Sequence, residues 1–394
     1  MNIKVSSLKS KLTHSDNFSK KSLEFIESIA NVLNNPITFS EIDDYDCDLK
    51  LIFVETGGSE GLFLKNIDKL KEPYYLLTNG GNNSLAASLE ILTYLSLNDK
   101  KGEILHGDIS YLANRIRELS TVSKALNELK NIKLGVIGKP SDWLISSVPA
   151  YELIKNKLGI SLFDIPLNIV EEKARNVSFL PRKIENKGFD KAEIDKAETV
   201  YYALKDIVNE YQLNGLTIRC FDLLTSLKRT GCLALALLND EGIVSTCEGD
   251  IMAMISMEIV KSITDEASFQ ANPSRIDVLK NEIVLAHCTI PLTMTTSYRY
   301  DTHFESGISV AIKGELKEEE ITIFRLSSNL KDYFVSTGKI LNNMDDKNLC
   351  RTQIRVKLDS DVSVLLKKPC GNHHIICYGN HKDEIEELMK QLLK

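Results

Sequence analysis

The fold is indicated most clearly by residues 231–259, GCLALALLNDEGIVSTCEGDIMAMISMEI. The first part of this stretch predicts a helix that ends at Gly242. Ile243–Cys247 predicts a short strand, and the apolar spacing from Asp250 onward predicts a second helix with its methionines in the core. Glu248 therefore lies where a strand ends and a helix begins, a place where α/β folds bind ligands. The alternative is that Glu248 is a first-turn acid that stabilises the helix dipole.

The same alternation of strands and helices extends outward from this stretch and predicts an α/β protein. Leu134–Gly138 is expected to be the first strand of the unit that contains Glu248, and a separate α/β unit is expected before it. After residue 265 the pattern changes to short strands, with candidates at 283–290, 308–314, 321–326, 333–340, 352–358 and 374–378. The expected domains are 1–130 (α/β), 131–265 (α/β) and 266–394 (β-rich).

Composition narrows the class of protein. The chain has 394 residues, of which 43% are hydrophobic and 26% charged, as is typical of soluble globular proteins. Its net charge of -7, from 48 basic and 55 acidic residues, argues against nucleic-acid binding. The longest apolar run, Cys232–Leu238, is far shorter than the roughly 20 residues of a membrane helix. With no apolar signal core and no CxxC pair among the cysteines, we expect a cytoplasmic protein with reduced thiols.

Two glycine-rich segments in the N-terminal part follow predicted strands. They are residues 56–61, TGGSEG, and residues 78–84, TNGGNNS. Backbone N–H groups in such loops can hold an anion at a helix N-terminus. Neither segment matches a dinucleotide-binding or Walker A pattern, and tight strand-to-helix turns are the favoured interpretation.

The histidines near the C-terminus suggest a different chemistry. His287 lies in a strand pattern, and His373 and His374 follow a Cys-Gly-Asn turn. Two imidazoles and one carboxylate can bind a first-row divalent metal. These residues match no local metal-binding motif, so buried structural histidines are the alternative.

The chain resembles the L-fucose isomerase and L-arabinose isomerase superfamily, particularly its shorter fucose-isomerase-related members. The resembling segments, in family order, are Leu216-Thr-Ile-Arg-Cys-Phe-Asp222, Ser245-Thr-Cys-Glu-Gly-Asp250, Ala286-His-Cys-Thr-Ile-Pro291, His303-Phe-Glu-Ser-Gly307, Cys350-Arg-Thr-Gln353 and Gly371-Asn-His-His374. The resemblance implies two flavodoxin-like α/β domains followed by a barrel-like β domain. It also implies a divalent metal, usually manganese, and a homo-oligomer with active sites near subunit contacts.

Carried over position by position, the resemblance makes Glu248, His287 and His374 the metal ligands. The family has a second carboxylate between the first two ligands, shortly after a phenylalanine. Here the segment after Phe269 offers only Ala271 or Asn272. Asn272 can donate a carbonyl oxygen to a hard metal, but it cannot act as a proton base.

The reaction implied is the interconversion of an aldose and a ketose through an enediol. Glu248 is the expected proton carrier, and Glu305 is the best replacement for the missing acid, unless it forms a strand-edge salt bridge. Arg219 and Arg351 are suited to recognising a carboxylate, phosphate or sulfonate, or else they pair with internal acids. Three further side chains are expected to contact the sugar: Trp143, His303 and His373.

The sequence thus predicts a metal-dependent aldose–ketose isomerase acting on a neutral sugar. An isomerase for an anionic sugar, such as a sulfosugar or a sugar acid, is the first alternative. A non-catalytic sugar-binding relative is the second, because the second carboxylate is absent.

Overall fold

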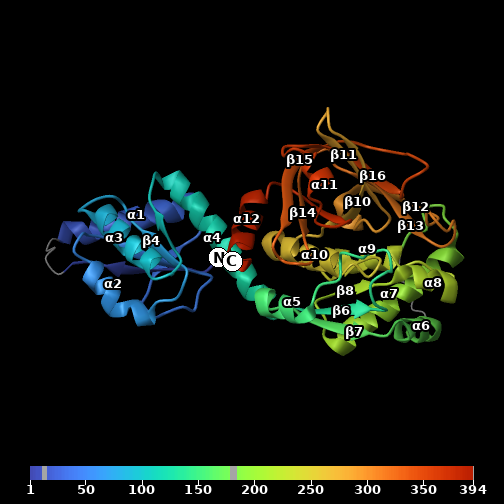
Figure 1. Ribbon diagram of the computed structural model, residues 1–394, viewed down its shortest axis with the longest axis horizontal. Coiled ribbons are helices and arrows are strands. Elements are labelled where there is room, and N and C mark those ends of the chain that lie inside the picture. The colour runs from blue at the N-terminus through green and yellow to red at the C-terminus, as the bar shows by residue number, and fades with distance from the viewer. Residues whose placement is uncertain (11–15, 178–183, 394) are drawn as a thin grey trace. The chain divides into compact units, whose positions relative to one another are not determined.

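The computed structural model describes residues 1–10, 16–177 and 184–393 (Figure 1). The chain divides into two compact units, Met1–Lys124 and Ala125–Lys394. The first is an α/β unit, and the second combines a parallel sheet and its helices with a closed antiparallel β-barrel. The predicted fold class is therefore confirmed, whereas the division of the chain at residues 130 and 265 stays a prediction.

The first unit is built on a five-stranded parallel sheet with the order β2-β1-β3-β4-β5, as in flavodoxin-like folds. Its strands are β1 (Ile3–Leu8), β2 (Ile37–Phe39), β3 (Leu49–Val54), β4 (Tyr74–Leu77) and β5 (Gly102–Leu105). Its helices are α1 (Asp16–Leu33), α2 (Glu60–Asn66), η1 (Ile67–Lys69), α3 (Ser84–Leu97) and α4 (Ile109–Leu129). Strand β3 is buried throughout because its alternating side chains enter two apolar clusters, Leu51 and Phe53 in one and Ile52 and Val54 in the other.

The second unit begins with a four-stranded parallel sheet of order β7-β6-β8-β9. The strands are β6 (Lys133–Ile137), β7 (Ser161–Ile165), β8 (Gly215–Ile218) and β9 (Val244–Thr246). The helices are α5 (Tyr151–Leu158), α6 (Leu167–Asn176), α7 (Lys191–Tyr211), α8 (Cys220–Ser226), α9 (Cys232–Asp240) and α10 (Ile251–Thr264). The helix, strand and helix predicted from residues 231–259 are thus α9, β9 and α10.

The rest of this unit is β-rich. Six strands close into a barrel, β10-β11-β16-β15-β14-β17. They are β10 (Phe269–Asp277), β11 (Glu282–His287), β14 (Glu320–Leu326), β15 (Tyr333–Asn343), β16 (Thr352–Leu358) and β17 (His374–Tyr378). A two-stranded sheet of β12 (Thr295–Asp301) and β13 (Ala311–Leu316) and the helices η2 (Leu292–Met294), α11 (Val364–Lys367) and α12 (Lys382–Leu392) complete it.

Helix α10 joins the two halves of the second unit. It packs against β8 and β9 of the sheet and against β14 and β17 of the barrel. Figure 1 shows α10 between β8 and β14. Every residue from Ile251 to Val260 is buried, so the methionines of this helix are core residues, as predicted. The residues just before α10 consequently lie where the carboxyl ends of the sheet strands meet the barrel.

Two strands of the β-rich part were not among the predicted ones. Strand β10 contains Pro273, which cannot donate a ladder hydrogen bond, and its register with β11 shifts between Pro273 and Arg275. Such a bulge accommodates the proline and hides the strand pattern. Strand β12 pairs with β13 alone, and most of its residues are polar or only partly buried, so it lacks the apolar alternation of a core strand.

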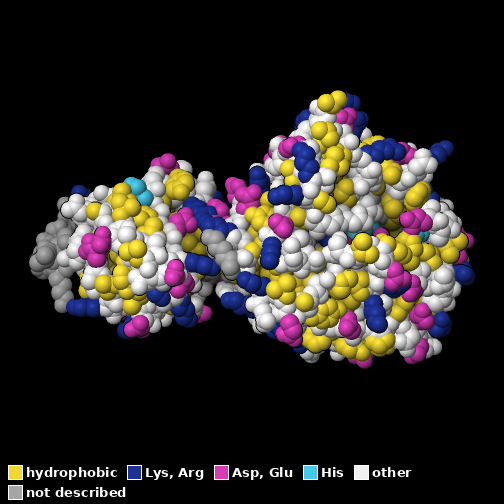
Figure 2. Space-filling model, in the orientation of Figure 1, with side chains coloured by type: hydrophobic (Ala, Val, Ile, Leu, Met, Phe, Trp, Pro, Cys, Tyr) yellow, Lys and Arg dark blue, Asp and Glu magenta, His cyan; other side chains and the backbone are white. Residues whose placement is uncertain are grey.

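Acidic and basic side chains of the described residues are interspersed over the face shown in Figure 2. All eight cysteines are unbridged. None of the helices in the described part of the chain has the length and the apolar character that crossing a bilayer requires.

Candidate active site

Glu248 lies in the short connection between β9 and α10, as expected, with its backbone in the left-handed region. Its φ is 65°, and Gly249 follows with φ 70°. A side chain at Gly249 would come within 2.5 Å of the Lys139 carbonyl oxygen, so the glycine is needed for close approach of two loops. The Ser141 N–H donates to the Glu248 carbonyl oxygen at 3.0 Å. This loop contact fixes the direction in which the Glu248 side chain leaves the backbone.

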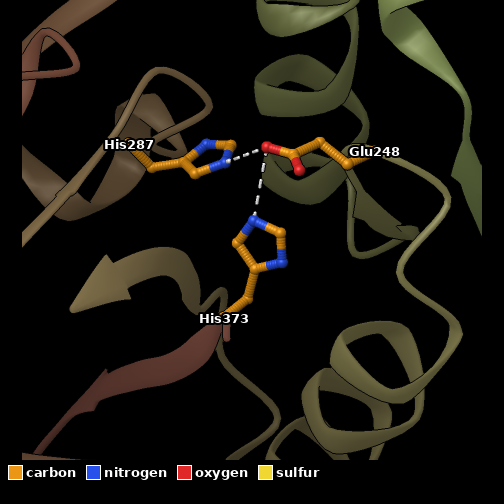
Figure 3. A group of neighbouring side chains, drawn as sticks. All are labelled: Glu248, His287 and His373. Atoms are coloured by element: carbon orange, nitrogen blue, oxygen red, sulfur yellow. Dashed lines mark ion pairs between the residues drawn. The ribbon is translucent and has the colours of Figure 1, made fainter. Parts of the chain in front are cut away.

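Two imidazoles face the Glu248 carboxylate (Figure 3). The Oε1 atom of Glu248 lies 3.7 Å from His287 Nε2 and 3.4 Å from His373 Nε2. His287 ends β11, and His373 immediately precedes β17, so both come from the barrel. One ligand atom from each of the three residues lies within 4.8 Å of the other two. The arrangement has the donor set and the spacing of a divalent-metal site.

The other nitrogen of each ring is anchored. His287 Nδ1 lies 3.0 Å from the Thr289 hydroxyl, and His373 Nδ1 lies 2.8 Å from Asp250 Oδ2. His373 Nε2 is buried and has no hydrogen-bond partner. This nitrogen forms an ion pair with Glu248 Oε1 at 3.4 Å but no hydrogen bond, and a buried nitrogen without a hydrogen bond costs free energy unless a ligand occupies it. These three residues therefore fit a bound cation.

The ionisation states of Glu248, His287 and His373 depend on one another. Burial opposes ionisation of Glu248, yet His287 and His373 hold its pKa well below the usual range. Burial likewise opposes the charged form of His373, but its contacts with the carboxylates of Asp250 and Glu248 raise its pKa to about 9. Burial lowers the pKa of His287 despite Glu248. These contacts favour the protonated form of His373, whereas metal binding requires the unprotonated Nε2.

The structure brings His373 to the position at which the sequence analysis expected His374. Successive residues of a strand point to opposite faces, and His374 pairs in register with Ala271. Its ring packs against Phe334 at 5.5 Å, and its Nδ1 lies 2.9 Å from the Asn372 carbonyl oxygen. His374 is not part of the three-residue group, and burial lowers its pKa to about 4. The tandem His-His sequence could not reveal which of the two faces the carboxylate.

Asn272 lies on β10 directly opposite Ala286, the residue before His287. Its Oδ1 atom is buried without a hydrogen-bond partner. Paired residues on neighbouring strands point to the same face, so Asn272 shares the face of Ala286 and not that of His287. A metal contact by Asn272 stays a prediction. Ala271 is wholly buried on the other face of the strand.

Aromatic side chains flank the carboxylate on its other side. The indole N–H of Trp143 donates to Glu248 Oε2 at 2.7 Å, and about half of this side chain is exposed. The Trp143 ring meets Phe221 edge-on at 5.1 Å, and Phe221 meets His303 edge-on at 5.4 Å. Trp143 and His303 thus lie in one aromatic row. The sequence analysis missed Phe221, although it lies in the resembling segment 216–222.

His303 and Glu305 lie in the loop that follows β12. Burial, together with the neighbouring His287 and Arg351, lowers the pKa of His303 to about 4. Its Nδ1 contacts the Ser306 hydroxyl at 3.0 Å. The side chain of Glu305 is largely exposed. Partial desolvation of its carboxylate and the charge of Glu248 nevertheless raise its pKa. Both residues are therefore close enough to Glu248 to respond to its charge.

Arg219 and Arg351, the two arginines predicted to contact the substrate, differ in their hydrogen-bond partners. Arg219 donates to Asp142 through both terminal nitrogens, at 3.1 and 2.8 Å, and its Nε donates to Asp222 at 3.0 Å. Arg351 donates from Nε to the Thr302 carbonyl oxygen at 2.8 Å and from Nη2 to the Thr302 hydroxyl at 3.2 Å. The guanidinium of Arg219 is thus paired with two internal acids. Arg351 has one acid nearby, with Asp301 Oδ1 3.6 Å from its Nη2, and it supports the loop that carries His303.

Comparison with known proteins supports a relationship to sugar isomerases. No family model matches the chain. It is 26% identical over 313 residues to a sulfoquinovose isomerase of Priestia aryabhattai, covering 72% of this chain and 68% of that protein. A sulfoquinovose isomerase of Alkalicoccus urumqiensis is 23% identical over 328 residues, covering 78% and 74%. These similarities confirm the prediction of an enzyme of the sugar-isomerase type, while the link to the L-fucose and L-arabinose isomerase superfamily stays a resemblance.

Proposed function

We propose that the protein is a metal-dependent ketol-isomerase that interconverts the aldose and ketose forms of a sulfosugar such as sulfoquinovose. The observation that carries the proposal is the convergence of Glu248, His287 and His373, whose buried Nε2 has no hydrogen bond. The relatives named for sulfoquinovose favour the anionic sugar over the neutral one that the sequence analysis placed first.

Glu248, His287 and His373 would hold the divalent cation, with Asn272 Oδ1 as a further candidate ligand. One carboxylate and two imidazoles suit several first-row metals, and the family resemblance makes Mn²⁺ the first to test. When bound, such a cation stabilises negative charge on the sugar oxygens at C1 and C2. Trp143, which holds Glu248 Oε2, limits rotation of the carboxylate and leaves Oε1 toward the two imidazoles.

The proton that moves between C1 and C2 needs a carboxylate within hydrogen-bond reach of the sugar. Glu248 and Glu305 are the candidates. A base works best when its pKa lies near the working pH, and that of Glu305 is shifted upward whereas that of Glu248 is shifted downward. We therefore assign metal binding chiefly to Glu248 and give both residues a share in proton transfer.

Arg351 is the proposed contact for the anionic group at the far end of the sugar. Arg219 is already paired with Asp142 and Asp222. Arg351 uses Nε and Nη2 for Thr302, and Asp301 lies 3.6 Å from the same Nη2. The third nitrogen, Nη1, is the proposed donor to a sulfonate oxygen. Arg351 also lies against Phe304, 5.8 Å from the ring centre, in the loop that carries His303 and Glu305. His303, Trp143 and Phe221 would cover the apolar faces of the sugar ring.

The decisive experiment is incubation with sulfoquinovose and Mn²⁺ in D₂O, followed by NMR. The expected result is conversion to the ketose with deuterium incorporated at the carbon that exchanges its proton. Turnover of neutral aldoses alone would support the neutral-sugar isomerase instead. Binding of metal and sugar with no turnover would support the non-catalytic sugar-binding relative.

A homo-oligomer with active sites near subunit contacts also stays a prediction. Beside Trp143, the side chain of Ile145 is 90% exposed and that of Val148 55% exposed. Apolar side chains exposed this fully next to a site are typical of surfaces that a partner covers. Light scattering of the purified protein measures the subunit number directly.

A further inference from the structure

A buried carboxylate stands behind one of the two imidazoles. Asp250 Oδ2 lies 2.8 Å from His373 Nδ1, and the side chains of both residues are fully buried. Asp250 comes from the α/β half of the unit, where it caps α10, and His373 comes from the barrel. The contact therefore joins the two halves directly behind the candidate metal site.

Asp250 cannot rotate, because both of its oxygens have other partners. Oδ1 accepts from the Ala253 N–H at 2.8 Å and from Arg325 Nη2 at 3.2 Å. Oδ2 accepts from Arg325 Nη1 at 3.1 Å in addition to contacting His373. A two-pronged arginine contact of this kind is both strong and directional.

Arg325 is held as firmly as the carboxylate it binds. Its side chain is fully buried on β14, and its Nη2 also donates to the Ser147 hydroxyl at 2.8 Å. A side chain at Gly371 would come within 2.6 Å of Nη2, so this position has to remain a glycine for the guanidinium to fit. Gly371 also has φ 137°, which other residues rarely adopt.

The two imidazoles consequently have different support. His287 Nδ1 faces a neutral hydroxyl, that of Thr289, whereas His373 Nδ1 faces an ionised carboxylate that an arginine locks in place. A carboxylate on the far nitrogen fixes the ring and increases the electron donation of the near nitrogen to a metal. The near nitrogen here is Nε2 beside Glu248, which has no hydrogen bond.

We propose that Asp250, locked by Arg325, is the positioning residue of the metal centre, and that it acts through His373. The inference rests on the metal dependence of the proposed function. Asp250 orients the imidazole before the cation arrives, so that binding does not have to order the ring. Because Arg325 and the N-terminus of α10 occupy its remaining lone pairs, Asp250 does not itself turn to the metal.

The test is a cycle of Asp250→Asn and His373→Ala, with Mn²⁺ affinity measured by calorimetry on the full chain. Asp250→Asn alone should weaken Mn²⁺ binding about 10- to 100-fold. In the His373→Ala background the same change should have no further effect, because the residue it acts through is gone. The visible spectrum of bound Co²⁺ should shift in Asp250→Asn, which loss of a purely structural contact would not cause.

Asp190→Asn is the matched control, since Asp190 caps α7 through the Ala192 N–H and Mn²⁺ affinity should not change. If Asp250→Asn does not fold, the double variant Asp250→Asn, Arg325→Gln leaves no unpaired buried charge and should show the same loss of affinity. Unchanged Mn²⁺ affinity and an unchanged Co²⁺ spectrum in a folded variant would overturn the positioning role alone. Failure of the unaltered protein to bind Mn²⁺ would overturn both this role and the proposed function.

Discussion

The two parallel sheets of the protein share a strand order but differ in what their carboxyl ends leave unsatisfied. In the first unit Glu55, which follows β3, accepts from the hydroxyls of Ser7 and Ser22. The glycine-rich loop after β4 closes on itself, with Thr78 donating to Ser84 and the Gly81 N–H donating to Asn79. These internal hydrogen bonds are typical of tight strand-to-helix turns, which the sequence analysis favoured over anion-binding loops.

In the second unit the equivalent edge carries Glu248, which faces two imidazoles instead of two hydroxyls. The difference comes from the barrel, which supplies both histidines to that edge. The carboxyl end of a strand in an α/β sheet therefore provides a position for a site but does not create one. The site forms here because the barrel places two imidazoles beside the carboxylate at that position.

The largest effect is expected from comparing Glu248→Gln with Glu55→Gln. The first should lower isomerase turnover by at least about 10²-fold with an unchanged melting temperature, since it removes a ligand and a proton carrier. The second should reduce stability and leave the activity of the folded fraction unchanged. More than a tenth of normal activity in Glu248→Gln would exclude this residue as the base.

The next largest effect is the expected difference in Mn²⁺ affinity between variants of the adjacent residues His373 and His374. His373→Ala should reduce Mn²⁺ affinity by more than the roughly 100-fold expected for a supporting residue. His374→Ala should bind Mn²⁺ within a few-fold of normal and unfold at a lower temperature, because it leaves a cavity beside Phe334. Calorimetry and thermal melts of both variants measure this, and equal affinities in the two would contradict the assignment to His373.

A smaller effect, confined to substrate choice, is expected at the two arginines. Arg351→Ala should raise KM for a sulfosugar about 10- to 100-fold and lower any activity on a neutral aldose much less. Arg219→Ala should act mainly on stability, because its partners are Asp142 and Asp222. Kinetics with paired acidic and neutral sugars distinguish these cases, and an Arg351→Ala variant that keeps both activities would make Arg351 structural.

The smallest effect on catalysis is expected at Glu258, a buried acid in α10 that influences stability instead. Burial raises its pKa to about 7, and its Oε2 has no hydrogen-bond partner. The folded state therefore binds more protons than the unfolded state between about pH 4.5 and 7, so stability falls as pH rises through this window. The loss should be on the order of 3 kcal/mol by pH 8.

Urea unfolding at pH 5 and pH 8 measures the effect of Glu258, and Glu258→Gln should be less sensitive to pH than the unaltered protein. Equal pH dependence in the two proteins would show that other groups dominate.

Much of the fold could be predicted because the spacing of apolar residues along the sequence shows which face of each helix or strand is buried. Strand β17 has the predicted bounds, and the Glu248 connection lies between a strand and a helix as expected. Pairing between distant segments leaves no such local signal. Strand β10 was missed because Pro273 and its bulge interrupt the alternation.

The site was predictable only in part, for the same reason. Residue types suggested Glu248 and His287 as members of the group. The choice between His373 and His374 depends on which of the two side chains points toward the Glu248 carboxylate, and the sequence does not show this. Phe221 gave no signal of its own, because an isolated aromatic residue in a sequence is ordinarily a core residue. One partner of Arg219, Asp222, is only three residues away in the sequence, but the other, Asp142, comes from a distant loop that only the fold brings near.

Gly371 has a consequence for how related sequences should vary. The guanidinium of Arg325 occupies the volume that a Cβ at position 371 would need. Chains that replace this glycine should therefore have lost the arginine as well, and chains that keep the arginine should keep the glycine. Co-variation of positions 325 and 371, forty-six residues apart, is thus expected to mark which distant homologues retain an intact metal centre.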